Sequence, residues 1–262
     1  MKLGNILAAG ALAFTGAAQA ADRTCSATSG PQTTALVELY TSEGCDSCPP
    51  ADHWLSSLFS RGFRADQVVP LALHVDYWDY IGWKDPFARG EFSVRQQKLA
   101  AMRRPVIVYT PQVLLQGQDF RRWASDDFTR QVARINSRAA RAGIALTIRA
   151  VEPTAIQAEL SATLFEPSQR KSAAVYLAAY ENRLASDVSA GENRGKRLEH
   201  DFVVREWIGP IGFGESLKLE DRRALPLLPG ADRKNLGIAA FVQDRSTSEV
   251  LQALMLPACR GS

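Results

Sequence analysis

The chain has 262 residues and a net charge of +3, and 46% of its residues are hydrophobic. This length is sufficient for one large domain or two small ones. The lysines and arginines are interspersed with acidic residues, whereas a nucleic-acid-binding surface favours a basic stripe with interleaved aromatic residues. Composition and charge therefore exclude nucleic acid as an expected partner.

The N-terminal segment is typical of a signal peptide. Lys2 supplies the positive end, residues 6–14 the short apolar run, and Ala18-Gln-Ala20 the small-residue cleavage signature. The apolar run is shorter than the roughly 20 residues that a membrane span needs, so we expect no stable membrane insertion. A buried N-terminal helix is the alternative interpretation. We expect cleavage near Ala20, with residues 1–20 removed, and a periplasmic or secreted mature protein.

The mature chain has four cysteines, which export to an oxidising compartment allows to form disulfides. Cys25 and Cys259 lie near the two chain ends, which are often close together in compact domains. We therefore predict a structural Cys25–Cys259 disulfide and a separate Cys45–Cys48 pair. The alternative is that Cys25 resolves a disulfide with the Cys45–Cys48 motif.

The first predicted strand covers residues 35–41, and its apolar composition is typical of a strand that is covered on both faces. Cys45-Asp-Ser-Cys48 follows it, and Pro49-Pro50 leads into apolar residues at helical spacing that stop at Gly62. Because prolines break a helix interior, both must lie in or before its first turn. The order is therefore strand, CxxC motif, helix.

A second buried strand is predicted at residues 68–75, and an aromatic and acidic segment follows at residues 76–83. Asp85-Pro86 is typical of a helix cap and first turn, so we predict a helix over 86–102. A third strand is predicted at 112–117. Ser125 begins a further amphipathic helix, for which Gly143 is the natural terminator.

Beyond residue 143 the pattern changes to short alternating or apolar runs of strand length, which favour an antiparallel sandwich or an elaborated sheet. These runs cover residues 145–151, 156–162, 173–180, 197–207, 214–219, 235–243 and 249–256.

Residues 33–142 resemble a thioredoxin-like domain in layout and motif. Nearly the whole mature chain is also similar to an exported bacterial family that is known only as a domain of unknown function. The similarity is found in the sequence motifs Leu39–Asp52, His74–Tyr80, Gly82–Phe87, Tyr109–Gln112, Gly191–Gly195 and Val203–Arg205.

The resemblance implies an α/β fold in two parts. We expect a thioredoxin-like domain over 21–142, with a βαβαβ core, the CxxC motif and a cis Thr110–Pro111 bond beside it. A mainly antiparallel, sandwich-like β domain is expected over 143–262. An ordinary trans proline at the start of a strand is the alternative for Pro111.

The resemblance also implies roles for four candidate catalytic residues. Cys45 would be the more exposed, attacking cysteine and Cys48 the buried, resolving one, with Pro111 lying against the pair. A helix N-terminus favours such a thiolate, whereas Asp46 next to the sulfur opposes it. Glu38 resembles the buried acid that shuttles a proton to the dithiol, and the alternative is a solvent-facing Glu38.

Thr110, Tyr77, Trp78 and Trp83 are candidates for a substrate groove beside the dithiol, or else for a contact that seats the β half on the first domain. A metal site of Cys45, Cys48 and His74 is a weaker hypothesis, because zinc and copper accept these ligands. The other interpretation of His74 is a core histidine that is hydrogen-bonded to Asp76 or Asp79.

We therefore predict a thiol–disulfide oxidoreductase that needs no cofactor beyond its redox-active Cys45–Cys48 disulfide. Its partners would be protein thiols, protein disulfides or a redox protein. Two alternatives stay open: a module that binds copper or zinc, and a partner-binding adaptor in which Cys45–Cys48 is an inert staple. The residue pattern does not indicate the direction of electron flow.

Overall fold

The computed structural model describes residues 24–102 and 106–259, so the predicted signal peptide lies outside the described residues. No helix in the described part is long and apolar enough to cross a membrane. The helices are α1 (Pro49–Ser56), α2 (Gly90–Ala101) and α3 (Asp126–Asn136). The strands are β1 (Cys25–Thr28), β2 (Ala35–Thr41), β3 (Val68–His74), β4 (Gln112–Leu115), β5 (Gln118–Asp119), β6 (Ala142–Val151), β7 (Ala155–Leu164), β8 (Ala173–Glu181), β9 (Leu184–Asp187), β10 (Arg197–His200), β11 (Val203–Gly212), β12 (Lys218–Pro226), β13 (Leu236–Asp244) and β14 (Val250–Pro257).

One mixed sheet runs through both halves of the chain. Its eight strands have the order β14-β13-β8-β11-β3-β2-β4-β5. β2 and β3 are parallel, with Thr41 opposite His74, so the carboxyl ends of both strands meet at one edge. β11 joins β3 in parallel through Val203 and Ala72, and it pairs with β8 in antiparallel orientation on its other side.

The predicted fold class is wrong. We expected a βαβαβ thioredoxin-like domain followed by a separate β domain, but β8, β11, β13 and β14 continue the same hydrogen-bonded sheet as β2, β3 and β4. The chain is mostly strand, with three α-helices among the described residues. Local sequence patterns predict strands but not which distant strands pair, and here β3 pairs with β11 from the second half. The domain boundary at residue 143 stays a prediction.

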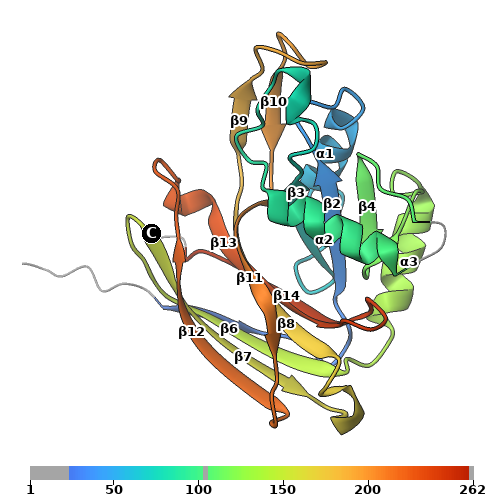
Figure 1. Cartoon of the computed structure of the whole chain (residues 1–262). Coiled ribbons are helices and arrows are strands. Elements are labelled where there is room, and N and C mark those ends of the chain that lie inside the picture. The colour runs from blue at the N-terminus through green and yellow to red at the C-terminus, as the bar shows by residue number, and fades with distance from the viewer. Residues whose placement is uncertain (1–23, 103–105, 260–262) are drawn as a thin grey trace, which may run out of the picture.

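A second sheet packs on one face of the large sheet. It has the order β1-β6-β7-β12 and forms the curved layer at the lower left of Figure 1. Every second residue of β7 is buried against β8, β13 and β14, as expected for a sheet with one solvated face. β8 is covered on both faces: Val175 and Leu177 face this layer, whereas Tyr176 and Tyr180 belong to the core on the helical side.

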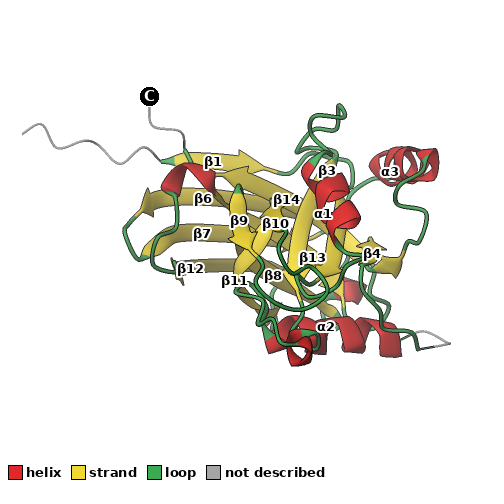
Figure 2. Cartoon of the chain, turned by 90° about the horizontal axis from the view of Figure 1, so that it is seen from above, coloured by secondary structure: helices red, strands yellow, loops and turns green. Residues whose placement is uncertain are grey.

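The helices cover the part of the large sheet that contains β2, β3 and β4. Figure 2 shows α1 and α3 on one side of this part and α2 on the other. Trp54 of α1 packs edge-on against Phe128 of α3, with 5.0 Å between the ring centroids. Ser125 caps α3 as predicted, because its Oγ accepts a hydrogen bond from the N–H of Asp127.

Two disulfides are present, as predicted. Cys25–Cys259 joins β1 to the segment after β14 over a sequence separation of 234, with 5.8 Å between the Cα atoms. The chain-entropy model assigns up to about 5 kcal/mol to a disulfide that closes so long a loop. Cys45–Cys48 has a sequence separation of 3, for which the same model gives only about 2 kcal/mol.

A buried ion pair fixes α2 on the sheet. Arg95 Nε donates to Glu38 Oε1 on β2 at 2.6 Å, and the guanidinium carbon lies 4.7 Å from the ring centre of Tyr176 and 4.9 Å from that of Trp207. Burial alone would lower the pKa of Arg95, but the Glu38 carboxylate raises it well above its usual value. Arg95 therefore stays charged in the folded protein.

We expect Glu38→Gln to lower the free energy of unfolding by about 3–5 kcal/mol, because the substitution leaves the buried Arg95 guanidinium without a counter-charge. Urea unfolding followed by circular dichroism measures the change. The double variant Glu38→Gln/Arg95→Met is the control, and it should regain much of the loss because no unpaired charge remains. A loss below about 1 kcal/mol in the single variant, the range of an exposed pair, would contradict this assignment.

Candidate functional site

The CxxC motif lies where β2 ends and α1 begins. Cys45 and Cys48 form a disulfide with 5.5 Å between their Cα atoms, and Cys48 is the N-cap residue of α1. Pro49 and Pro50 occupy the first two helical positions, as the sequence predicts, and neither has an N–H group to offer. Cys45 Sγ lies 3.3 Å from Ser47 Oγ, so this hydroxyl is the polar side-chain group in contact with the sulfur.

Both cysteines are completely buried, with 0% exposure for each residue, although Asp46 and Ser47 between them are exposed. The prediction of an exposed Cys45 is therefore corrected. Residues from the second half of the chain bond to the motif, which the local sequence around residue 45 does not reveal.

The connection between β9 and β10, residues 188–196 and here called the hairpin loop, bonds to the backbone of the CxxC motif. Asn193 Nδ2 donates to the carbonyl oxygens of Glu43 and Cys45, at 2.8 Å each, and Asn193 is completely buried. Glu192 Oε2 accepts from the N–H of Asp46 at 3.0 Å. The polar Gly191–Gly195 phrase is typical of a surface turn, so the role of Asn193 was missed by sequence reasoning.

The hairpin loop also packs closely on the segment that follows β3. A Cβ atom built on Gly191 would lie 3.0 Å from Ile81 Cδ1 and 3.3 Å from Trp83 Cβ, and φ of Gly191 is +70°. Both observations restrict this position to glycine. Glycine is therefore needed at position 191 because the hairpin loop approaches Ile81 and Trp83 so closely.

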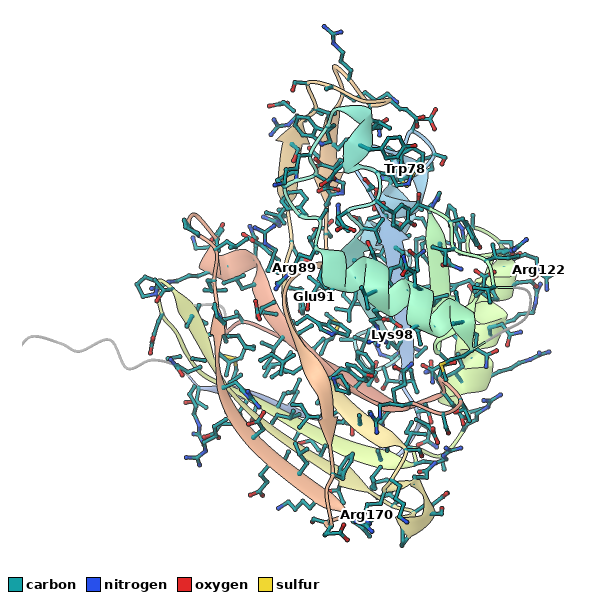
Figure 3. All side chains as sticks on the ribbon, viewed as in Figure 1. Trp78, Arg89, Glu91, Lys98, Arg122 and Arg170 are labelled. Carbon is teal, nitrogen blue, oxygen red and sulfur yellow. A yellow bond between two sulfur atoms is a disulfide. The ribbon has the colours of Figure 1, made fainter. Side chains whose placement is uncertain are left out.

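The predicted groove residues lie in this same region, and their polar atoms bond within the molecule. Trp78, near the top of Figure 3, donates from Nε1 to Thr110 Oγ1 at 2.6 Å. The Tyr77 hydroxyl donates to Gln96 of α2, and Trp83 Nε1 donates to Glu43 Oε2. These rings therefore join the segment after β3 to its neighbours, and their contact with a substrate stays a prediction.

Pro111 and Glu38 are the other two predicted catalytic residues. The Thr110–Pro111 peptide is cis, and Pro111 directly precedes β4. Glu38 is buried, but it faces α2, whereas Cys48 begins α1 on the opposite side of the sheet (Figure 2). The structure does not bring Glu38 to the dithiol, because the alternation of β2 turns it to the other face.

A second group of polar side chains lies one helical turn beyond Cys48. Asp52 of α1, His74 at the end of β3 and His200 at the end of β10 place one ligand atom each within 4.8 Å of one another, and all three are buried. His74 and His200 stack edge-on with 4.9 Å between ring centres. His74 was a predicted ligand, but this group contains neither cysteine.

Each of the two imidazoles contacts a buried carboxylate. His74 Nδ1 lies 2.7 Å from Asp85 Oδ2, and His200 Nε2 lies 3.1 Å from Glu43 Oε1. Sequence reasoning paired His74 with Asp76 or Asp79 and placed Asp85 at a helix cap. Instead α2 begins at Gly90, and Asp85 is a buried acceptor for His74.

Burial and neighbouring charges shift two of these carboxyl groups in opposite directions. Burial raises the pKa of Asp52 to about 7, against the lowering effects of His200 and the Thr41 hydroxyl. Burial alone would also raise the pKa of Asp85, but the His74 imidazole and the N–H groups of Glu43 and Phe87 lower it. Asp85 is therefore the more strongly ionised of the two.

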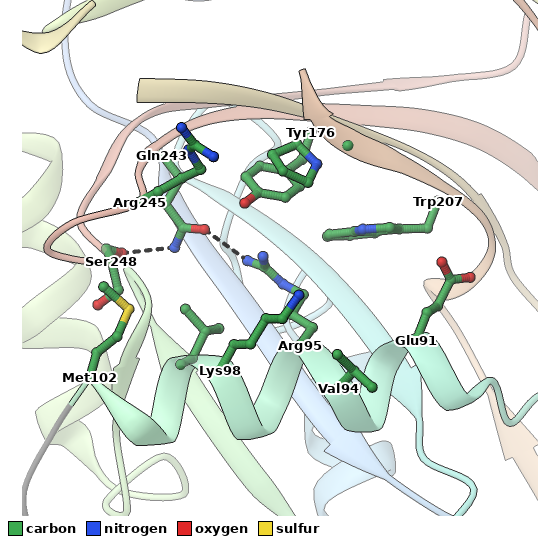
Figure 4. A pocket seen from close by; sticks show the side chains of 13 residues that line it. Glu91, Val94, Arg95, Lys98, Met102, Tyr176, Trp207, Gln243, Arg245 and Ser248 are labelled. Atoms are coloured by element: carbon green, nitrogen blue, oxygen red, sulfur yellow. Dashed lines mark hydrogen bonds between the residues drawn. The ribbon is translucent and has the colours of Figure 1, made fainter. Parts of the chain in front are cut away.

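A cavity of about 460 Å³ lies on the α2 side of the sheet, and sequence reasoning did not find it. Figure 4 shows Arg95 pointing into it between Tyr176 and Gln243, with Lys98 and Arg245 also on its wall. Gln243 bonds both Arg95 and the carbonyl oxygen of Ser248. This cavity is on the face of the sheet opposite α1, away from the disulfide.

The sequence profile of a family described as "Protein of unknown function (DUF1223)" matches residues 36–243. The chain belongs to this family. The match extends from β2 to β13, so it includes the CxxC motif, the hairpin loop and all three residues of the second group. No curated protein matches the chain.

Two solved structures are similar to this DUF1223 protein. An Agrobacterium tumefaciens protein solved by X-ray crystallography is 24% identical with a TM-score of 0.58, and the match covers 89% of this chain and 98% of that one. HBP35 of Porphyromonas gingivalis is 13% identical with a TM-score of 0.65, over 87% of this chain and 76% of that one. At these identities the similarity shows the fold alone.

We expect Asn193→Ala to speed the reduction of Cys45–Cys48 by dithiothreitol about tenfold or more. The substitution removes two hydrogen bonds that hold the hairpin loop over the motif, each worth about 1 kcal/mol. Thiol labelling followed by mass spectrometry gives the rate for each disulfide separately. Asn235→Ala, in the short 3₁₀ helix Arg233–Asn235 before β13, is the matched control, and the rate for Cys25–Cys259 should be unchanged in both variants. An unchanged rate for Cys45–Cys48 would refute the covering role of Asn193.

Proposed function

We propose that this DUF1223 protein exchanges disulfides with protein thiols through Cys45 and Cys48, in an oxidising compartment outside the cytoplasm. The observation that carries the proposal is the disulfide between the end of β2 and the start of α1. It closes too short a loop to contribute much stability, and Cys25–Cys259 already joins the chain ends. Disulfide exchange explains why Cys45 and Cys48 are paired, whereas stabilisation of the fold does not.

The exchange conserves electrons and protons in two steps. In the reduced protein, the Cys45 thiolate attacks a substrate disulfide, forms a mixed disulfide and releases one substrate thiolate. Cys48 then loses its proton and attacks Cys45 Sγ, which releases the second substrate thiolate and forms Cys45–Cys48. The reverse sequence oxidises two substrate thiols, so the same residues serve either direction.

Cys45 is the better attacking residue on local grounds. The hydroxyl of Ser47 is close enough to donate to a Cys45 thiolate. The missing N–H groups of Pro49 and Pro50 remove two donors that a helix start would otherwise supply. Thiolate stabilisation therefore depends on Ser47 and on the dipole of α1.

Both cysteines are fully buried, so exchange needs a movement that exposes Cys45. The hairpin loop is the candidate for this movement, because Asn193 binds the carbonyl oxygens of Glu43 and Cys45 and would have to release them. The loop would then act as a gate that slows, but does not prevent, the reaction of the oxidised pair with small thiols. Signal-like residues at the N-terminus and two disulfides are compatible with export, where such protection is useful.

The same burial favours a second candidate function, in which Cys45–Cys48 is an inert staple. The staple would hold the loop that presents Glu43, which bonds His200 and Trp83. A staple forms once and needs no gate, so reactivity of the pair distinguishes the two functions.

The test is the reduction of insulin by the full chain, with dithiothreitol as the source of electrons. Wild-type protein should accelerate the reaction. In Cys45→Ser the protein-dependent rate of insulin reduction should fall at least a hundredfold, because the attacking sulfur is gone. Cys48→Ala should accumulate a mixed disulfide between Cys45 and insulin, detectable by mass spectrometry. Asp46→Asn, which changes the exposed residue next to Cys45 but keeps both sulfurs, is the control and should stay active.

Exchange is ruled out if Cys45→Ser is as active as the wild type, or if the wild type gives no acceleration over dithiothreitol alone. Either result leaves the staple as the better description of the pair.

A further inference from the structure

Three buried ligand atoms in the second group lack a hydrogen-bond partner. Among the described residues, seven buried side-chain atoms have none, and three of these are Asp52 Oδ1, His74 Nε2 and His200 Nδ1. Asp52 is 5% exposed, His200 3% and His74 0%. A buried polar atom without a partner is unfavourable, so three of them on residues that lie together indicate a missing common partner.

The hydrogen bonds of each residue leave the unpartnered atom able to bind a cation. Asp85 accepts from Nδ1 of His74, and Glu43 accepts from Nε2 of His200, so in each neutral imidazole the lone pair lies on the other nitrogen. Thr41 Oγ1 donates to Asp52 Oδ2, which leaves Oδ1 free. A carboxylate behind each ligating imidazole is the usual second shell of a protein metal site.

Charge favours a cation as well. Asp52, Asp85 and Glu43 are three buried carboxyl groups beside two imidazoles, and a dication would offset their charge when they are ionised. Phe87 packs edge-on against both imidazoles, with ring centres 5.3 Å from His74 and 5.7 Å from His200, which excludes water from that side.

We propose that Asp52, His74 and His200 form a binding site for a divalent transition metal, with Zn²⁺ as the best-fitting ion. Two imidazole nitrogens and one carboxylate oxygen are a common donor set for zinc sites that keep a fourth position open. Zinc ligands lie about 2 Å from the ion, so atoms now within 4.8 Å of one another need to move inward by about 1 Å.

This site differs from the CxxC-based metal hypothesis, because its ligands include no sulfur. It lies next to the dithiol, since the N–H of Asp52 donates to the carbonyl oxygen of Cys48 at 3.1 Å. The metal proposal does not depend on disulfide exchange, because it uses none of the exchanging atoms.

The test is calorimetric titration of the oxidised, metal-free full chain with Zn²⁺. We expect one ion per chain, and at least a hundredfold weaker binding in His200→Gln and in Asp52→Asn. His53→Gln is the matched control, because His53 is an exposed histidine on the same helix as Asp52. Cys45→Ser/Cys48→Ser should bind Zn²⁺ as the wild type does, whether or not the protein exchanges disulfides.

A second measurement uses wild-type protein and so does not depend on the folding of any variant. Co²⁺ in place of Zn²⁺ should give visible d–d absorption without the near-ultraviolet charge-transfer band of a cobalt–thiolate bond. Absence of saturable Zn²⁺ and Co²⁺ uptake by the wild type would overturn the proposal. A thiolate band, or undiminished binding in the folded ligand variants, would overturn it too.

Discussion

Glu43 bonds three separate segments of the chain at the edge where β2 and β3 end. Its Oε1 contacts His200 from β10, its Oε2 accepts from Trp83, and its backbone N–H donates to Asp85 at 2.8 Å. Its carbonyl oxygen accepts from Asn193. A buried carboxylate needs such partners to compensate for lost water. The CxxC loop, the hairpin loop and the segment after β3 therefore hold one another in place through this one residue.

The hairpin formed by β9 and β10 supplies both halves of the proposed chemistry. Asn193, in its loop, bonds the carbonyl oxygen of Cys45, and His200, at its end, completes the group with Asp52 and His74. The backbone turns after β10 at Phe202, whose φ is +58°, and then enters the large sheet as β11 beside β3. Opening the hairpin to reach the sulfurs would therefore also disturb the side of the group that carries His200. The proposed exchange pair and the proposed metal ligands therefore both contact this one hairpin.

Sequence patterns predicted most strands, because burial on one or both faces leaves an alternating or continuous apolar run, as in β7 and β8. The two disulfides followed from the positions of the cysteines. The arrangement of the sheet was not predictable, since nothing near Ala72 indicates that Val203 lies beside it. For the same reason His200 and Asn193 were missed: each is a polar residue in a polar segment and becomes functional only through contacts more than a hundred residues away. The pairing of Glu38 with Arg95 likewise depends on where α2 packs.

The proposed function depends on a Cys45–Cys48 disulfide that is buried in the folded protein and can still exchange. Its reduction potential, measured by equilibration of the full chain with glutathione buffers and read separately for each disulfide by mass spectrometry, tests this most directly. We predict a potential above about −300 mV for Cys45–Cys48 and a lower one for Cys25–Cys259, as for reactive and structural disulfides respectively. A value below about −300 mV for Cys45–Cys48 would identify it as a permanent staple and contradict the account.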